Sequence, residues 1–154
     1  MILKLNSFSA EDTFKIGRKL AALLQGNELI LLSGNLGAGK TVLTKGIGSF
    51  FKIEPNSIVS PTFTLMNIYE GTENIFHLDL YRIGENLNGP VPEIDDNIGH
   101  GIIIVEWAQY LEQLYSGEDN LINIELFTGN DYNESRDIII SSETINTDMS
   151  YFTT

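Results

Sequence analysis

The sequence predicts an α/β fold, a three-layer sandwich in which a mostly parallel sheet lies between helices. The apolar run Leu29–Leu32 fits a buried parallel strand, and the residues from Thr41 to Phe51 fit the helix that follows it. Further strand-like and helix-like segments alternate along the chain, with a hairpin and C-terminal strands expected as antiparallel additions to the sheet.

A helix is predicted ahead of that strand, from about Ala10 to Gln25. Ser9 is placed to act as its N-cap, and Asp12 adds a favourable negative charge to the first turn. Apolar and small residues then recur at helical spacing, so one face of the helix packs on the core: Phe14, Gly17, Ala21 and Leu24.

The segment Gly34–Thr41 reads GNLGAGKT and fits the pattern G-x-x-x-x-G-K-[ST] at every fixed position. Its glycines let consecutive backbone N–H groups cradle phosphates, Lys40 can reach the β- and γ-phosphates, and the Thr41 hydroxyl can bind Mg²⁺. The phosphates also meet a helix N-terminus there, which favours anions. We therefore expect a P-loop NTPase-like fold that binds a nucleoside triphosphate through Asn35, Leu36, Gly37, Ala38, Gly39, Lys40, Thr41 and Val42.

A hairpin is predicted after the loop helix. Thr64–Tyr69 and Ile75–Leu80 have strand character and flank the turn-like segment Glu70–Asn74. Tyr81–His100 is rich in glycine and proline and reads as irregular, with a helical turn near Glu93–Ile98.

The C-terminal part is predicted to complete the sheet. The expected elements are a strand at Gly101–Glu106, a helix at Ala108–Tyr115, and strands at Leu121–Phe127 and Asp137–Ser141. Residues 1–141 are expected to form one domain, and residues 142–154 a polar tail that either frays or folds back.

Charge and composition limit the function. Nine lysines and arginines oppose 21 aspartates and glutamates, which gives a net charge of −12, and only three of the cations are arginines. Strong direct binding to nucleic acid is not expected, because it depends on cationic side chains. The chain has no cysteine, no signal-peptide core and no apolar run of membrane-spanning length, so a cytoplasmic protein is expected.

Two carboxylates compete for the second acidic role that a phosphate loop requires. Glu106 follows four apolar residues, at the end of a predicted central strand, and Asp79 ends a similar run. In open parallel sheets this end faces the ligand crevice. Either carboxylate can support Mg²⁺ or orient the attacking water, and the two can also act together.

The hydroxyl-rich segment Ser60–Thr64 is a third candidate, since switch segments that sense nucleotides lie after the loop helix. Ordinary turn chemistry around its proline would explain it equally well. His77 is interpreted as a structural histidine, and Trp107 by default as a packing aromatic. Arg82 can meet either phosphate or a carboxylate.

Taken together, these motifs resemble the bacterial TsaE family, formerly called YjeE. The resemblance rests on the phosphate loop followed in order by Ser60–Leu65 (SPTFTL), His77–Arg82 (HLDLYR) and Glu106–Trp107. It covers most of the chain, roughly from Ser9 to Glu125.

The resemblance implies an ATPase required for threonylcarbamoylation of adenosine 37 of tRNA. Family members associate with TsaB and TsaD, and ATP hydrolysis resets the modifying complex, so tRNA is met only through that complex. By motif, ATP and Mg²⁺ would be held by Lys40, Thr41 and Glu106. Asp79, Thr62 and Trp107 match switch and active-site positions, which makes Glu106, Asp79 and Thr62 the expected catalytic residues.

The chain departs from the family pattern at Val42, where many members have a second threonine, and at Ala108, where a proline is common. Two other functions compete with the family reading. One is a small phosphotransferase, which the few arginines and the absence of an obvious acceptor lid disfavour. The other is a nucleotide-gated binding module with negligible turnover. A GTPase is disfavoured because the sequence has no Asn-Lys-x-Asp motif.

Overall fold

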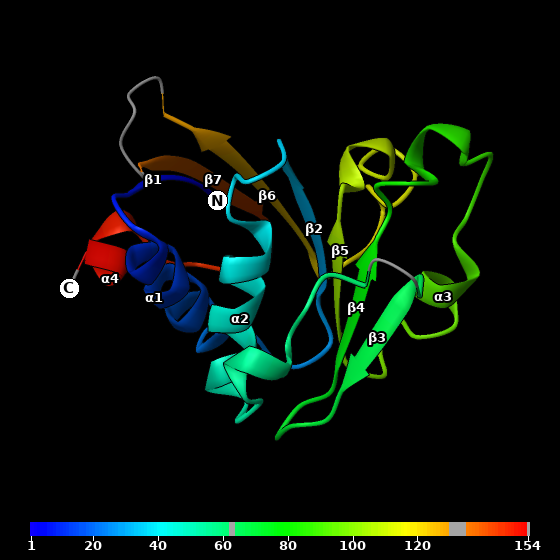
Figure 1. The fold of residues 1–154 in the computed structure, drawn as a ribbon, viewed down its shortest axis with the longest axis horizontal. Helices are drawn as coiled ribbons and strands as arrows, with labels where there is room; N and C mark the ends of the chain where they lie inside the picture. The colour runs from blue at the N-terminus through cyan, green and yellow to red at the C-terminus, as the bar shows by residue number, and fades with distance from the viewer. Residues whose placement is uncertain (62–63, 130–134, 154) are drawn as a thin grey trace.

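One mixed sheet organises the chain in the computed structural model, which describes residues 1–61, 64–129 and 135–153 (Figure 1). Within these residues the sheet has seven strands, in the order β1-β7-β6-β2-β5-β4-β3. The strands are β1 (Ile2–Ser7), β2 (Leu29–Gly34), β3 (Met66–Tyr69), β4 (Ile75–Asp79), β5 (Ile102–Glu106), β6 (Leu121–Thr128) and β7 (Arg136–Ser142).

The centre of the sheet is parallel and its edges are antiparallel. β2 pairs in parallel with both β5 and β6, and β4 pairs in parallel with β5. β3 adds to β4 as a hairpin, while β7 and then β1 extend the other edge in antiparallel pairs. The α/β fold expected from the sequence is confirmed, and the apolar runs of β2 and β5 are buried at its centre.

Side chains alternate between two apolar layers along the central strands. In β2, Ile30 and Leu32 pack with α1 (Ala10–Ala21) and α2 (Lys40–Phe50), which lie side by side in Figure 1. Leu29 and Leu31 pack on the opposite face. That face is covered by short elements and turns, namely α3 (Pro92–Asp95), η3 (Ala108–Tyr110) and Leu87, which follows η2 (Gly84–Asn86).

The start of α1 matches the prediction, but its end does not. The Ser9 hydroxyl accepts the Asp12 N–H at 3.1 Å, as expected of an N-cap. The helix ends at Ala21 instead of Gln25. Beyond it the N–H groups of Leu23 and Leu24 bond to carbonyls three residues back, which tightens the last turn. The Glu28 carboxylate then accepts the N–H groups of residues 25, 26 and 27 at 2.5 to 3.1 Å, so the helix does not continue to Gln25.

The helix predicted at Ala108–Tyr115 is wrong. Only η3 is helical, and single turns follow it to Gly117. Ala108, Leu111 and Tyr115 are all buried against the sheet. They are three and four residues apart, which is also the spacing of the buried face of a helix. The Tyr115 hydroxyl is engaged elsewhere: it accepts the Val91 N–H at 3.0 Å and donates to Asp95 at 2.8 Å.

The C-terminal residues fold back onto the domain. Ile145 is buried in the same layer as α1, as is Phe152 of α4 (Met149–Thr153). The Lys19 ammonium donates to the Phe152 carbonyl at 3.2 Å, and the Tyr151 hydroxyl donates to the Lys19 carbonyl at 3.1 Å. Across the described ranges, every helix is too short or too polar to cross a bilayer.

Candidate nucleotide site

The glycine-rich loop connects β2 to α2, as the sequence predicts. Gly37 and Gly39 have φ angles of 78° and 103°, a left-handed conformation that glycine adopts without strain. Beside the loop is a cleft of about 450 Å³, which is in the size range of small-molecule sites. It is lined by residues 36–42 and by Ser60, Asp79, Tyr81, Glu106 and Trp107.

Lys40 is held over its own loop. Its ammonium donates to the carbonyls of Gly34 at 2.6 Å and Asn35 at 3.0 Å, and it lies 4.2 Å from the centre of the Trp107 ring. Burial lowers the pKa of Lys40, while the nearby carboxylates of Glu106 and Asp79 oppose this effect. The cation is therefore already positioned at the cleft.

Oxygen atoms from three segments converge below the loop. The Thr41 Oγ1 atom lies 3.0 Å from Oε1 of Glu106, and Ser60 Oγ lies 3.2 Å from Oε2. The two hydroxyls are 2.9 Å apart. Two O–H groups supply two protons for these three contacts, so at most two can be hydrogen bonds at once. A hard cation would relieve this shortage of donors, and oxygen is the ligand that Mg²⁺ prefers.

The carboxylate of Glu106 is nearly enclosed, with 2% of its residue surface exposed. Nε2 of His77, on the neighbouring strand β4, lies 3.2 Å from Oε2. Burial alone would raise the pKa of Glu106, but the His77 imidazole and the hydroxyls of Thr41 and Ser60 outweigh it and lower the pKa. The charged form that a metal ligand needs is thus favoured.

Asp79 lies beside Glu106 in the parallel register of β4 and β5. Its carboxylate accepts the Tyr81 N–H at 2.9 Å. Burial raises the pKa of Asp79, and the Glu106 charge adds to this, against the effect of the Tyr81 hydrogen bond. The structure therefore brings both competing carboxylates to one cleft but shifts their pKa values in opposite directions.

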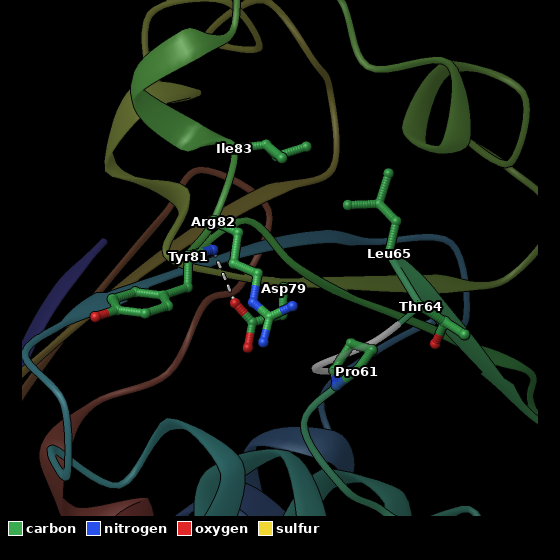
Figure 2. A pocket seen from close by; sticks show the side chains of 7 residues that line it. All are labelled: Pro61, Thr64, Leu65, Asp79, Tyr81, Arg82 and Ile83. Carbon is green, nitrogen blue, oxygen red and sulfur yellow. Dashed lines mark hydrogen bonds between the residues drawn. The ribbon is translucent and has the colours of Figure 1, made fainter.

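A second hollow adjoins Asp79 on the side away from the loop. Figure 2 shows Asp79, which ends β4, and Arg82, which follows it, opposite Pro61 and Thr64, which precede β3. Tyr81 lies at the boundary between this hollow and the cleft, and its ring is 4.8 Å from that of Trp107. Thr62 lies outside the described residues, so its expected role stays a prediction.

Arg136 contacts the phosphate loop, which sequence reasoning did not predict. It starts β7, and its Nη2 atom donates to the Gly37 carbonyl at 3.1 Å, across 99 residues of sequence. Together with Thr13 and Val42 it lines a smaller hollow on the far side of the loop. No local signal marks this contact, because it depends on how β7 pairs in the sheet.

His77 and Trp107, which the sequence suggested were structural residues, both contact residues of the candidate site. Trp107 contacts Lys40 and has a φ angle of 59°, which is uncommon for a bulky residue and is typical of functional sites. Among the described residues no group of three or more histidine, aspartate or glutamate side chains could hold a metal. Thr41 and Glu106 still fit Mg²⁺, which usually keeps several waters and takes few protein ligands.

Comparisons with known proteins point to one family. The family described as "Threonylcarbamoyl adenosine biosynthesis protein TsaE" matches residues 7–138. A relative from Aquifex aeolicus, named tRNA threonylcarbamoyladenosine biosynthesis protein TsaE, is 44% identical over 105 residues, 66% of this chain and 73% of that protein. A relative of the same name from Nostoc is 39% identical over 134 residues, 83% and 80% of the two chains.

A solved structure has the same fold. The crystal structure of YdiB from Bacillus subtilis superposes with a TM-score of 0.70 at 28% sequence identity. The match covers 92% of this chain and 86% of the other.

Proposed function

This chain belongs to the TsaE family of tRNA threonylcarbamoyladenosine biosynthesis proteins, and we propose that it is a Mg²⁺-dependent ATPase in that process. We further propose that it supports threonylcarbamoylation of adenosine 37 of tRNA by acting on a complex of TsaB and TsaD. The observation that carries the proposal is the convergence of Lys40, Thr41 and Glu106 on one cleft beside a phosphate loop.

The loop would hold ATP through its backbone and through Lys40. The N–H groups of residues 35–42 would meet the phosphates at the start of α2, and the Lys40 ammonium would exchange its two carbonyl partners for phosphate oxygens. Thr41 and Glu106 would hold Mg²⁺, which when bound offsets the negative charge of the phosphates. The lowered pKa of Glu106 supports this role, because only the carboxylate form ligates a metal.

Hydrolysis requires a group that orients water and accepts its proton. We assign this role to Asp79, because burial and the Glu106 charge raise its pKa and make its carboxylate a better base. Thr62, in the neighbouring switch-like segment, completes the proposed catalytic set. Its flanking residues Pro61 and Thr64 line the hollow next to Asp79, which supports its assignment to this site.

Charge supports an indirect route to tRNA. A chain with a net charge of −12 lacks the cationic surface that binds nucleic acid by counterion release. The segments 60–65 and 77–82 border the cleft at Ser60, Asp79 and Tyr81. Nucleotide-dependent ordering of these segments would let TsaB and TsaD sense whether ATP is bound.

The proposal is tested by reconstituting tRNA modification with TsaB, TsaD and their threonylcarbamoyl donor, with and without this chain. We expect the chain to raise the number of tRNAs modified per TsaD, and only with ATP and Mg²⁺. No effect of the chain, or an effect that persists with a non-hydrolysable ATP analogue, would contradict the proposal. The analogue result would instead favour a nucleotide-gated binding module, and ATP use that depends on an added metabolite would favour a phosphotransferase.

A further inference from the structure

His77 is a polar side chain in an apolar layer. It is fully buried in β4, on the face of the sheet that packs against α1 and α2, where its neighbours are Ile75, Ile102 and Ile104. Its Nδ1 atom has no hydrogen-bond partner among the described residues, and the one polar group facing its Nε2 atom is the Glu106 carboxylate, at 3.2 Å. An unpaired buried polar group costs stability, and an aliphatic side chain would pack there without that cost. Core packing alone therefore does not explain the imidazole.

The imidazole meets the site through one atom of Glu106. The register pairs His77 with Ile104 and Asp79 with Glu106, so His77 lies one step behind Glu106 on the same face of the sheet. Its Nε2 atom is 3.2 Å from Oε2, on a carboxylate whose Oε1 faces Thr41. Oε1 of Glu106 is thus held by Thr41, while Oε2 lies between the Ser60 hydroxyl and, on the core side, the His77 imidazole.

We infer that His77 is a positioning residue that fixes the orientation of the Glu106 carboxylate towards Thr41. It lines neither the cleft nor the hollow beside Asp79, so it acts through Glu106 instead of touching the nucleotide. The inference rests on the proposed function, in which Thr41 and Glu106 hold Mg²⁺. Its consequence is selective: removing the imidazole should weaken the contribution of the metal to ATP binding and spare the contacts of the phosphate loop.

The test compares ATP affinity in Mg²⁺ and in EDTA, measured by calorimetry on the full chain. For His77→Leu we expect the tightening by Mg²⁺ to fall about tenfold or more, the usual loss when a residue supporting a metal ligand is removed. The affinity in EDTA should stay within about twofold. His77→Gln should restore the Mg²⁺ effect, because its amide nitrogen reaches the position of Nε2. His77→Asn should not, because its amide ends near Nδ1.

A matched control separates this role from general destabilisation. Ile75→Val changes the same face of β4 two residues away and should lower the melting temperature without altering the Mg²⁺ effect. If His77→Leu keeps the Mg²⁺ effect of the parent chain, or if the Gln and Asn variants behave alike, the inference is overturned. If the parent chain shows no Mg²⁺ effect at all, the proposed function itself fails. Should His77→Leu not fold, the Gln and Asn pair decides the question.

Discussion

The Thr41 hydroxyl lies 3.0 Å from the Glu106 carboxylate, although 65 residues separate them in the sequence. Thr41 is in the first turn of α2, and Glu106 ends β5. The parallel pairing of β2 with β5 sets Leu32 opposite Glu106, two residues before the phosphate loop begins. The sheet register therefore places a carboxylate beneath the loop.

Lys40→Ala should weaken ATP binding by about 2 kcal/mol or more, roughly thirtyfold, the usual cost of truncating one partner of a buried charge pair. Among the described residues that line the cleft Lys40 is the one lysine, so no other ammonium of that lining would replace it. Calorimetry with ATP and Mg²⁺ measures the change. Lys45→Ala, on the same helix but outside the lining of the cleft, is the control and should bind nearly as the parent does. If Lys40→Ala binds ATP as tightly as the parent does, the phosphate loop is not the ATP-binding site.

Asp79→Asn should stabilise the fold near neutral pH. Burial, and then the Glu106 charge, raise the pKa of Asp79 in the folded state above its ordinary 3.8. The stability linked to this group is thus fully present below the unfolded pKa and is lost as pH rises through the folded pKa. Melting temperatures should favour the Asn variant at pH 7, and the difference should vanish as pH falls towards 3.8.

Glu106→Gln is a control for that experiment, because it should change the melting temperature at pH 7 in the opposite direction. The pKa of Glu106 is lowered on folding, so its contribution to stability exists above the unfolded pKa and disappears as pH falls through the folded pKa. The Gln variant should melt below the parent at pH 7. If the melting temperatures of the two variants depend on pH in the same way, the pKa values of Asp79 and Glu106 are not shifted in opposite directions by folding.

Arg136→Ala should reduce ATP affinity about two- to fivefold, because the guanidinium no longer holds the Gly37 carbonyl and the loop becomes less ordered before binding. The tightening by Mg²⁺ should be unchanged, since Arg136 lies on the far side of the loop. Arg18→Ala is a matched control: it removes a similar bond, from Arg18 to the Ser49 carbonyl at the other end of α2. If both variants lose equal affinity, the effect of Arg136 is not local.

The free chain should show no salt-sensitive binding to tRNA at physiological ionic strength. Its net charge of −12 opposes approach to a polyanion, and few phosphates could be neutralised by nine cationic side chains spread along the sequence. Fluorescence anisotropy of labelled tRNA, repeated over a series of salt concentrations, measures this. Micromolar binding that weakens steeply with salt would show that the chain binds tRNA directly and would contradict the indirect route.

Local sequence signals predicted the centre of the molecule well. The phosphate loop, β2, β5 and the β3–β4 hairpin each carry their own signal in glycine spacing or apolar runs. The strand β1 was missed because its six residues offer only a short alternation, with Leu3 and Leu5 inward, and its partner β7 is distant in sequence. Edge strands of this kind are defined by pairing more than by composition.

The site was predicted where its residues belong to motifs, and missed where contacts cross the fold. Lys40, Thr41, Glu106 and Asp79 line one cleft, as their positions at loop and strand ends imply. The contact of His77 with Glu106 depends on the register between β4 and β5. The bond from Arg136 to Gly37 depends on where β7 lies in the sheet. Neither the register of β4 against β5 nor the position of β7 in the sheet can be predicted from residues that are adjacent in the sequence.

The central claim is that Glu106 and Thr41 form a metal-dependent ATPase site, and phosphate release by Glu106→Gln in the presence of TsaB and TsaD tests it most directly. The substitution removes the charge but keeps the shape of the side chain. We predict turnover at least about a hundredfold below the parent, with ATP still bound through the loop. Turnover equal to that of the parent would contradict the account.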